Sequence, residues 1–126
     1  MSSVAEVMKQ VVLTVAPEDS IGEAAAKMTE ADVGAVVVSD FGRVIGILTE
    51  RDVMRAVARR THSSITRVRE WMTSDPITAP PDMNAEEAAR TMLDHGFRHL
   101  PVMQDGRPVG IVSLRDIARW AMSGVE

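Results

Sequence analysis

Two short motifs of the chain place a hydroxyl three residues before a carboxylate. They are GILTERD, residues 46–52, and GIVSLRD, residues 110–116. A Ser or Thr that precedes a helix, with an acidic residue in the first turn, is typical of a helix cap. The same geometry suits a nucleotide, because a helix N-terminus presents amides to phosphate and a carboxylate can accept hydrogen bonds from a ribose diol. The motifs alone leave both interpretations open.

These motifs are copies within a longer repeat. Shifted by 64 residues, the chain aligns with itself without a gap and gives 17 identities in 62 aligned positions. Chance would give roughly four, so the repeat is real. Either half is too small to bury a good core alone. We therefore expect two repeats, residues 1–62 and 65–126, that pack together as one pseudo-symmetric module.

Each repeat predicts the element order β-α-β-β-α. Ser20 and Asn84 carry the signals of a helix N-cap, and turns containing Gly42 and Gly106 separate apolar segments as in β-hairpins. The expected strands are 12–15, 35–39 and 44–48, then 77–79, 99–103 and 109–112; the expected closing helices are 50–59 and 114–122. This order predicts an α/β (α+β) fold with two small sheets and helices packed against them.

Composition excludes several functions. The chain has 126 residues, a formal net charge of −4 and no Cys, so zinc-thiolate sites, disulfides and thiol nucleophiles are impossible. The first ten residues lack the charged start and apolar run of a signal peptide, and no apolar stretch reaches the ~18 residues of a membrane-spanning helix. We therefore expect a soluble cytoplasmic protein that does not contact a membrane.

The ordered set of motifs resembles a known family. Each repeat is similar to a CBS domain, and the whole chain resembles a stand-alone CBS domain pair, or Bateman module. The resemblance rests on LTVAPEDSIGEAAAKM and ITAPPDMNAEEAARTM, followed by ADVGAVVVSDFGRVIGILTERD and HGFRHLPVMQDGRPVGIVSLRD. It implies two repeats that pack through their sheets about a pseudo-twofold axis. It also implies two clefts that bind adenosine derivatives: AMP, ADP, ATP, S-adenosylmethionine or a dinucleotide such as NAD(H).

The resemblance assigns ligand-binding roles by position. Asp52 and Asp116 would hold the ribose hydroxyls, and Thr49 and Ser113 would contact ribose or phosphate. The remaining implied residues line the sugar and base pocket, flank the adenine or meet phosphate near the dyad: Thr14, Val15, Thr78 and Ala79; Val36 and Leu100; Arg98 and His99. Because Arg98 and His99 correspond to Gly34 and Ala35 in the first repeat, we expect two unequal clefts.

Other candidate sites are weaker. His95 and His99 are four residues apart, but Gly96 lies between them and no further ligand cluster is visible, so we expect no metal site. The middle of the chain is basic, which indicates either a solvated helix face and linker or a patch for RNA or DNA. The residues concerned are Arg51, Arg55, Arg59, Arg60, Arg67 and Arg69, with His62. Trp71 and Trp120 could fill the core or anchor a partner.

No catalytic triad, metal cluster or phosphate-binding Walker loop is visible. We therefore interpret the chain as a non-catalytic sensor, without a catalytic cofactor, that binds an adenosine-containing molecule and signals to an unknown protein effector by a conformational change. From the family we expect a homodimer, and the acidic total argues against nucleic acid as a partner. The alternatives are an interaction module in which the motifs only cap helices, and a nucleic-acid binder that uses the central arginines.

Overall fold

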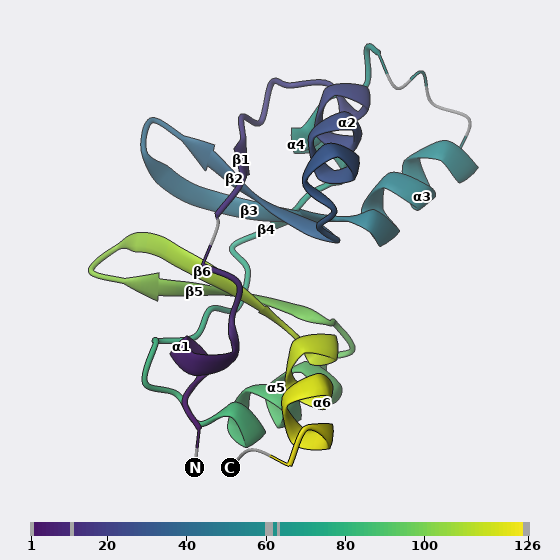
Figure 1. Ribbon diagram of the computed structural model, residues 1–126. Coiled ribbons are helices and arrows are strands. Elements are labelled where there is room, and N and C mark those ends of the chain that lie inside the picture. Colours follow the sequence, from purple (N-terminus) through teal and green to yellow (C-terminus); the bar gives the residue numbers. More distant parts are fainter. Residues whose placement is uncertain (1, 11, 60–61, 63, 125–126) are drawn as a thin grey trace. The chain divides into compact units, whose positions relative to one another are not determined.

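The computed structural model describes residues 2–10, 12–59, 62 and 64–124. Its elements, labelled in Figure 1, are α1 (Val4–Val7), β1 (Thr14–Val15), α2 (Ile21–Ala31), β2 (Ala35–Asp40), β3 (Arg43–Thr49), α3 (Glu50–Ala58), α4 (Val68–Trp71), β4 (Thr73–Ser74), α5 (Ala85–His95), β5 (His99–Gln104), β6 (Arg107–Ser113) and α6 (Leu114–Met122). The predicted mixed α/β class and the two repeats are confirmed, and each repeat also begins with a short helix, α1 or α4, that the predicted order lacked.

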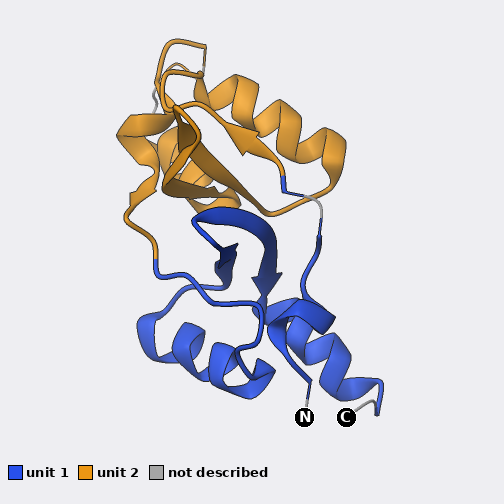
Figure 2. Ribbon diagram, turned by 90° about the vertical axis from the view of Figure 1, so that its left-hand side faces the viewer, with its two compact units in different colours: residues 1–12, 77–126 blue, residues 13–76 orange. Residues whose placement is uncertain are grey.

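The chain forms two compact units that do not coincide with the sequence repeats. Unit 1 comprises residues 1–12 and 77–126, and unit 2 comprises residues 13–76 (Figure 2). Each unit therefore contains the body of one repeat and the entry helix of the other. α1 begins the first repeat but belongs to unit 1, while α4 begins the second repeat but belongs to unit 2.

Strand pairing follows the same pattern in both units. In unit 2, β1 runs parallel to β2, and β2 and β3 form an antiparallel hairpin to which β4 adds an antiparallel edge. In unit 1, β5 and β6 form the hairpin, and isolated bridges at Ala79 and Lys9 replace the two short edge strands. The strand predicted at 77–79 is therefore a single bridge, and the one predicted at 12–15 is shortened to Thr14–Val15.

The entry helices are held by hydrogen bonds that repeat at the offset of 64. In unit 1, the Val4 amide donates to Met83 O at 2.7 Å and the Ala85 amide donates to Ser2 O at 3.0 Å. In unit 2, the equivalent bonds run from Val68 to Asp19 O at 2.9 Å and from Ile21 to Thr66 O at 2.9 Å. Val4 and Val68 are fully buried, so each short helix is fastened by both its backbone and an apolar side chain.

Gly46 and Gly110 allow the segment after each entry helix to lie against a strand. A Cβ atom at Gly46 would lie 2.8 Å from Thr73 O, and one at Gly110 would lie 2.7 Å from Lys9 O. A Cβ at either glycine would also overlap a methionine sulfur, that of Met72 or Met8. The close neighbour of each motif glycine is therefore another part of the backbone, as expected for glycine inside a strand.

Each unit has its own hydrophobic core on the helix side of its sheet. The unit 2 core includes Val15, Ile21, Ala24, Met28, Val36, Val38, Leu48, Ala56 and Val68. The unit 1 core includes Val4, Ala79, Ala85, Ala88, Met92, Leu100, Val102, Val112 and Ile117. The predicted caps start the helices beneath these cores: Ser20 Oγ accepts from the Glu23 amide, and Asn84 Oδ1 accepts from the Glu86 amide. The pKa of Glu23 is lowered by the hydrogen bonds that its carboxylate accepts from Ser20.

The two tryptophans occupy reciprocal places in the two cores. In unit 1, α6 carries Trp120 and packs against α1, which carries Val7. In unit 2, α3 carries Ala56 at the position equivalent to Trp120, while α4 carries Trp71 at the position equivalent to Val7. Each pair of packed helices thus contributes one tryptophan and one smaller residue. The tryptophan is on the closing helix in unit 1 and on the entry helix in unit 2. The core-filling interpretation of both tryptophans is confirmed by their packing.

This arrangement predicts a compensating pair of mutations in unit 2. Trp71→Val should leave a cavity and destabilise the fold by about 2 kcal/mol, and Ala56→Trp should overpack it by a similar amount. Together they reproduce the unit 1 arrangement, so the double variant should recover at least about 1 kcal/mol of the summed loss. Urea denaturation of the four proteins measures this coupling. Ala58→Trp, at an exposed position of the same helix, is the control that should not rescue Trp71→Val. Additive losses would contradict the reciprocal packing.

Candidate functional site

The N-terminus of α3 is closed by its own side chains. Thr49 is the N-cap residue: its Oγ1 accepts from the Asp52 amide at 3.3 Å and donates to Asp52 Oδ2 at 3.0 Å. The Thr49 amide donates to the same carboxylate oxygen at 2.9 Å. Asp52 is only 6% exposed. The capping interpretation of GILTERD is therefore confirmed. Of the side-chain oxygens of this cap, only Oδ1 of Asp52 makes no hydrogen bond with the described residues.

The N-terminus of α6 has the same cap in a looser form. Ser113 Oγ accepts from the Asp116 amide at 2.9 Å, and the Ser113 amide donates to Asp116 Oδ2 at 3.2 Å. Within the described residues the Ser113 hydroxyl donates no hydrogen bond to the carboxylate, and Asp116 is only half-buried. This cap therefore keeps a hydroxyl donor and a carboxylate oxygen that an external group could use.

The caps also determine which amides in the first turn of each helix are still able to donate a hydrogen bond to a ligand. The Glu50 amide donates to Gly34 O and the Leu114 amide donates to Arg98 O, both at 2.9 Å. Since Asp52 and Asp116 give their amides to the cap hydroxyls, two of the first three amides of each helix are engaged. Among the hydrogen bonds of the described residues, none uses the amide of Arg51 or Arg115. Sequence reasoning did not single out these two amides, although their position between the cap and the acidic residue identifies them.

The side chains around the two caps differ. In unit 1, β5 and β6 pair His99 with Ser113, and Arg98 precedes β5, so these residues and Asp116 gather at the start of α6. Arg98 is exposed and His99 is half-buried. In unit 2, Ala35 pairs with Thr49 at the equivalent place and is buried. The cap of α6 is therefore flanked by a cationic side chain and an imidazole that the cap of α3 lacks.

The other residues implied by the resemblance divide into exposed and buried sets. Thr14 and Thr78 are exposed next to β2 and β5, respectively. Four apolar residues, Val15, Val36, Ala79 and Leu100, are at most 3% exposed and belong to the cores of their units. Their side chains pack against helices, so a ligand at these positions would meet mainly backbone.

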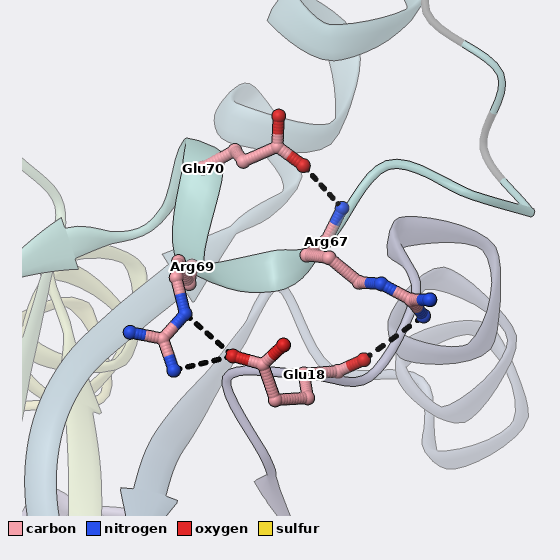
Figure 3. Close-up of polar contacts among 4 residues, drawn as sticks. All are labelled: Glu18, Arg67, Arg69 and Glu70. Atoms are coloured by element: carbon pink, nitrogen blue, oxygen red, sulfur yellow. Dashed lines mark hydrogen bonds and ion pairs between the residues drawn. The ribbon is translucent and has the colours of Figure 1, made fainter.

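Two of the central arginines are held by Glu18. Arg69 forms an ion pair with the Glu18 carboxylate, and Arg67 donates to Glu18 O at 3.1 Å (Figure 3). The Arg67 amide donates to Glu70 Oε2 at 2.8 Å. These contacts attach α4 to the loop before α2. Arg67 and Arg69 therefore have a structural role in stabilising the fold. The remaining described arginines of the group, Arg51, Arg55 and Arg59, are exposed on or beside α3, and Arg60 lies outside the described residues.

The described residues contain no group of three or more His, Asp or Glu side chains that could hold a metal ion. The two histidines weighed as a pair belong to different elements: His95 ends α5, where its Nδ1 lies 2.9 Å from Thr91 O, and His99 begins β5. Over the same residues, each helix is too short or too polar to span a bilayer.

The duplicated fold and its two caps define a class of paired-repeat modules, and comparison with known proteins identifies it. The CBS domain family model matches residues 4–59 and 68–123. The chain therefore belongs to the CBS domain family and contains a CBS domain pair. The CBS domain-containing protein YhcV of Bacillus subtilis is 37% identical over 123 residues, which cover 98% of this chain and 88% of that protein.

Solved structures agree with this assignment. A putative signal-transduction protein with CBS domains from Burkholderia ambifaria has 31% sequence identity and a TM-score of 0.92, covering 99% of this chain and 97% of that one. A CBS domain pair solved in complex with 5′-methylthioadenosine and S-adenosyl-L-methionine has 28% identity and a TM-score of 0.91, covering 98% of each chain. The inosine-5′-monophosphate dehydrogenase of Methanocaldococcus jannaschii is 36% identical over 116 residues, or 22% of its own length.

The difference between the caps predicts unequal structural roles for the two aspartates. Asp52→Ala removes two hydrogen bonds to a buried carboxylate and leaves the Thr49 amide without its partner, which should cost about 2 kcal/mol of stability. Asp116→Ala removes one longer bond at a half-buried position and should cost about 1 kcal/mol or less. Chemical denaturation without added ligand measures both losses. If Asp116→Ala lost more stability than Asp52→Ala, the proposal that the α3 cap is the tighter of the two would be contradicted.

Proposed function

We propose that this protein is a non-catalytic regulatory module that binds an adenosine-containing molecule at the start of α6. The observation that carries the proposal is the open cap in unit 1, where the Ser113 hydroxyl and Asp116 Oδ1 are uncommitted among the described contacts. A carboxylate oxygen can accept a hydrogen bond from a ribose hydroxyl, and the Arg115 amide can donate to an anionic oxygen.

The charges near this cap favour a ligand that carries an anionic group. Arg98 is exposed immediately before β5, and its guanidinium can bind phosphate or carboxylate in a bidentate manner. His99 lies opposite Ser113 in the strand register. Thr78 is exposed in the same unit and completes the set of polar side chains. AMP, ADP, ATP and NAD(H) carry phosphate, and S-adenosylmethionine carries a carboxylate, so all remain candidates. The complex of a structural relative with S-adenosyl-L-methionine supports this class of ligand.

The equivalent set in unit 2 has a mainly structural role in this proposal. Thr49 and Asp52 satisfy each other, and Gly34 and Ala35 provide no charged side chain. Thr14 and Oδ1 of Asp52 could still contact a ligand, but the ligand would have to displace the hydrogen bonds of the cap to use Thr49 or Asp52 Oδ2. Binding should therefore be dominated by unit 1, and a partner protein would read the resulting change in conformation.

A ligand panel tests the proposal. AMP, ADP, ATP, S-adenosylmethionine, 5′-methylthioadenosine and NADH would each be added during chemical denaturation. A ligand at about 100 times its Kd should stabilise the fold by roughly 2.7 kcal/mol. Asp116→Ala and Arg98→Ala should lose most of this stabilisation, whereas Asp52→Ala, measured against its own unliganded stability, should keep it. No response to any of the six would favour the pure interaction module instead.

The single tryptophan in each unit provides an independent test of location. Trp120 lies on α6, whose N-terminus carries the open cap, whereas Trp71 lies in unit 2. Ligand binding should change the emission of the Trp71→Phe variant, in which only Trp120 remains. The Trp120→Phe variant should respond weakly. The reverse result would place the dominant site in unit 2.

We also propose that the module forms a homodimer through its helices. Met54 and Val57 on α3 in unit 2, and Leu93 on α5 and Met122 on α6 in unit 1, are 63–87% exposed, which is unfavourable for large apolar side chains in an isolated chain. Met54→Glu and Leu93→Glu should shift the molar mass measured by light scattering from dimer to monomer. Ala26→Glu, at an exposed position of α2, is the control that should leave the mass unchanged. A wild-type monomer at high protein concentration would contradict this proposal.

A further inference from the structure

Phe41 occupies an unfavourable position at the tip of the β2–β3 hairpin. Its side chain is 98% exposed, the largest exposure among the large hydrophobic residues described, and it belongs to neither hydrophobic core. Its φ angle is 52°, in the left-handed region that bulky residues avoid. The following Gly42 has φ 79°, so the two residues form the tight turn between Asp40 and Arg43.

The hairpin of the other unit shows what this turn requires. Asp105 and Gly106 connect β5 to β6 with φ angles of 52° and 77°, nearly the same backbone geometry. Aspartate tolerates the left-handed region better than phenylalanine, and Asp-Gly is a favoured pair for such turns. Phe41 therefore contributes nothing to the turn that a polar residue would not provide at a lower free energy.

The aromatic content of the chain makes this placement more informative. The sequence has two Phe, two Trp and no Tyr. Both tryptophans pack against the cores, and Phe97 packs against the unit 1 core. Phe41 is the remaining aromatic residue, and it combines full exposure with an unfavourable backbone conformation. Strained residues of this kind are typical of functional positions.

We propose that Phe41 is an anchor residue that inserts into an apolar pocket of a partner protein. A single aromatic side chain on a tight turn has the shape of an interface hot spot, because it can be buried completely without movement of the rest of the module. Asp40 and Arg43 flank it, and the exposed Arg43 can pair with an acidic rim around the pocket.

The charges of the hairpin favour a protein over a membrane as the occupant. A membrane-binding loop needs several basic or apolar residues together, whereas this tip has one apolar side chain between one acid and one base. This inference does not depend on the identity of the nucleotide, so its failure would leave the proposed binding site intact.

Site-specific photo-crosslinking in cells of the source organism tests the proposal. p-Benzoylphenylalanine would replace Phe41 in one strain and Asp105 in another. We expect position 41, but not position 105, to form an adduct with a discrete protein. The decisive step is binding with purified components: Phe41→Asp should weaken the affinity for that protein at least tenfold, whereas Phe41→Trp and Asp105→Asn should change it less than threefold.

A stability measurement separates loss of docking from loss of folding. Because aspartate is the natural residue in the matching turn, Phe41→Asp should raise Tm by about 3 °C while it abolishes binding. A lower Tm would show that Phe41 makes an intramolecular contact and would overturn the proposal. It would also be overturned if position 41 yields no adduct beyond that of position 105, or if Phe41→Asp binds the captured protein normally. The same conclusion would follow if the adduct is a second copy of this chain, or if Phe41 is instead needed for binding to phosphatidylcholine–phosphatidylglycerol vesicles.

Discussion

The close approach of two backbone segments at Gly46 and Gly110 is the constraint on which the rest of the structure depends. Thr73 in unit 2 and Lys9 in unit 1 lie so near these glycines that no side chain could fit. The approach lets the segment after an entry helix pair with the last strand of a repeat body. Because the entry helix comes from the other repeat, each compact unit requires both halves of the sequence.

The glycine also fixes where the other functional residues of each motif lie. Three residues after each glycine the strand ends at a hydroxyl that caps the next helix, and three residues later a carboxylate closes the cap. Capping and binding are therefore not exclusive interpretations, because a cap uses only part of its hydrogen-bonding capacity. Thr49 and Asp52 consume more of it than Ser113 and Asp116 do. Function in this module depends on the groups that the fold leaves uncommitted.

Most of the fold could be predicted from the sequence because its signals are local. Ser20 and Asn84 marked the starts of α2 and α5, and the Gly-containing turns marked both hairpins. The exchange of α1 and α4 could not be predicted, since the hydrogen bonds that hold them join residues 45 to 83 positions apart in sequence. The predicted site residues were less uniform: the polar ones are at or near the ends of strands and helices, but Val36 and Leu100 are fully buried in the cores of their units.

Duplication allowed the two units to diverge at equivalent positions while both kept the same backbone. The tryptophan lies on the closing helix in unit 1 and on the entry helix in unit 2, so different members of the packed pair fill the volume of each core. The cap became tighter in unit 2, and the hairpin turn of unit 2 carries Phe41 where unit 1 has Asp105. The first difference is compensated in volume within its unit. The open cap of unit 1 and the exposed ring of unit 2 have no such compensation among the described residues, and this distinction is what separates a packing difference from a functional one. A ligand that completes the cap and a protein that buries the ring would each supply the missing contacts, in different units of the same chain.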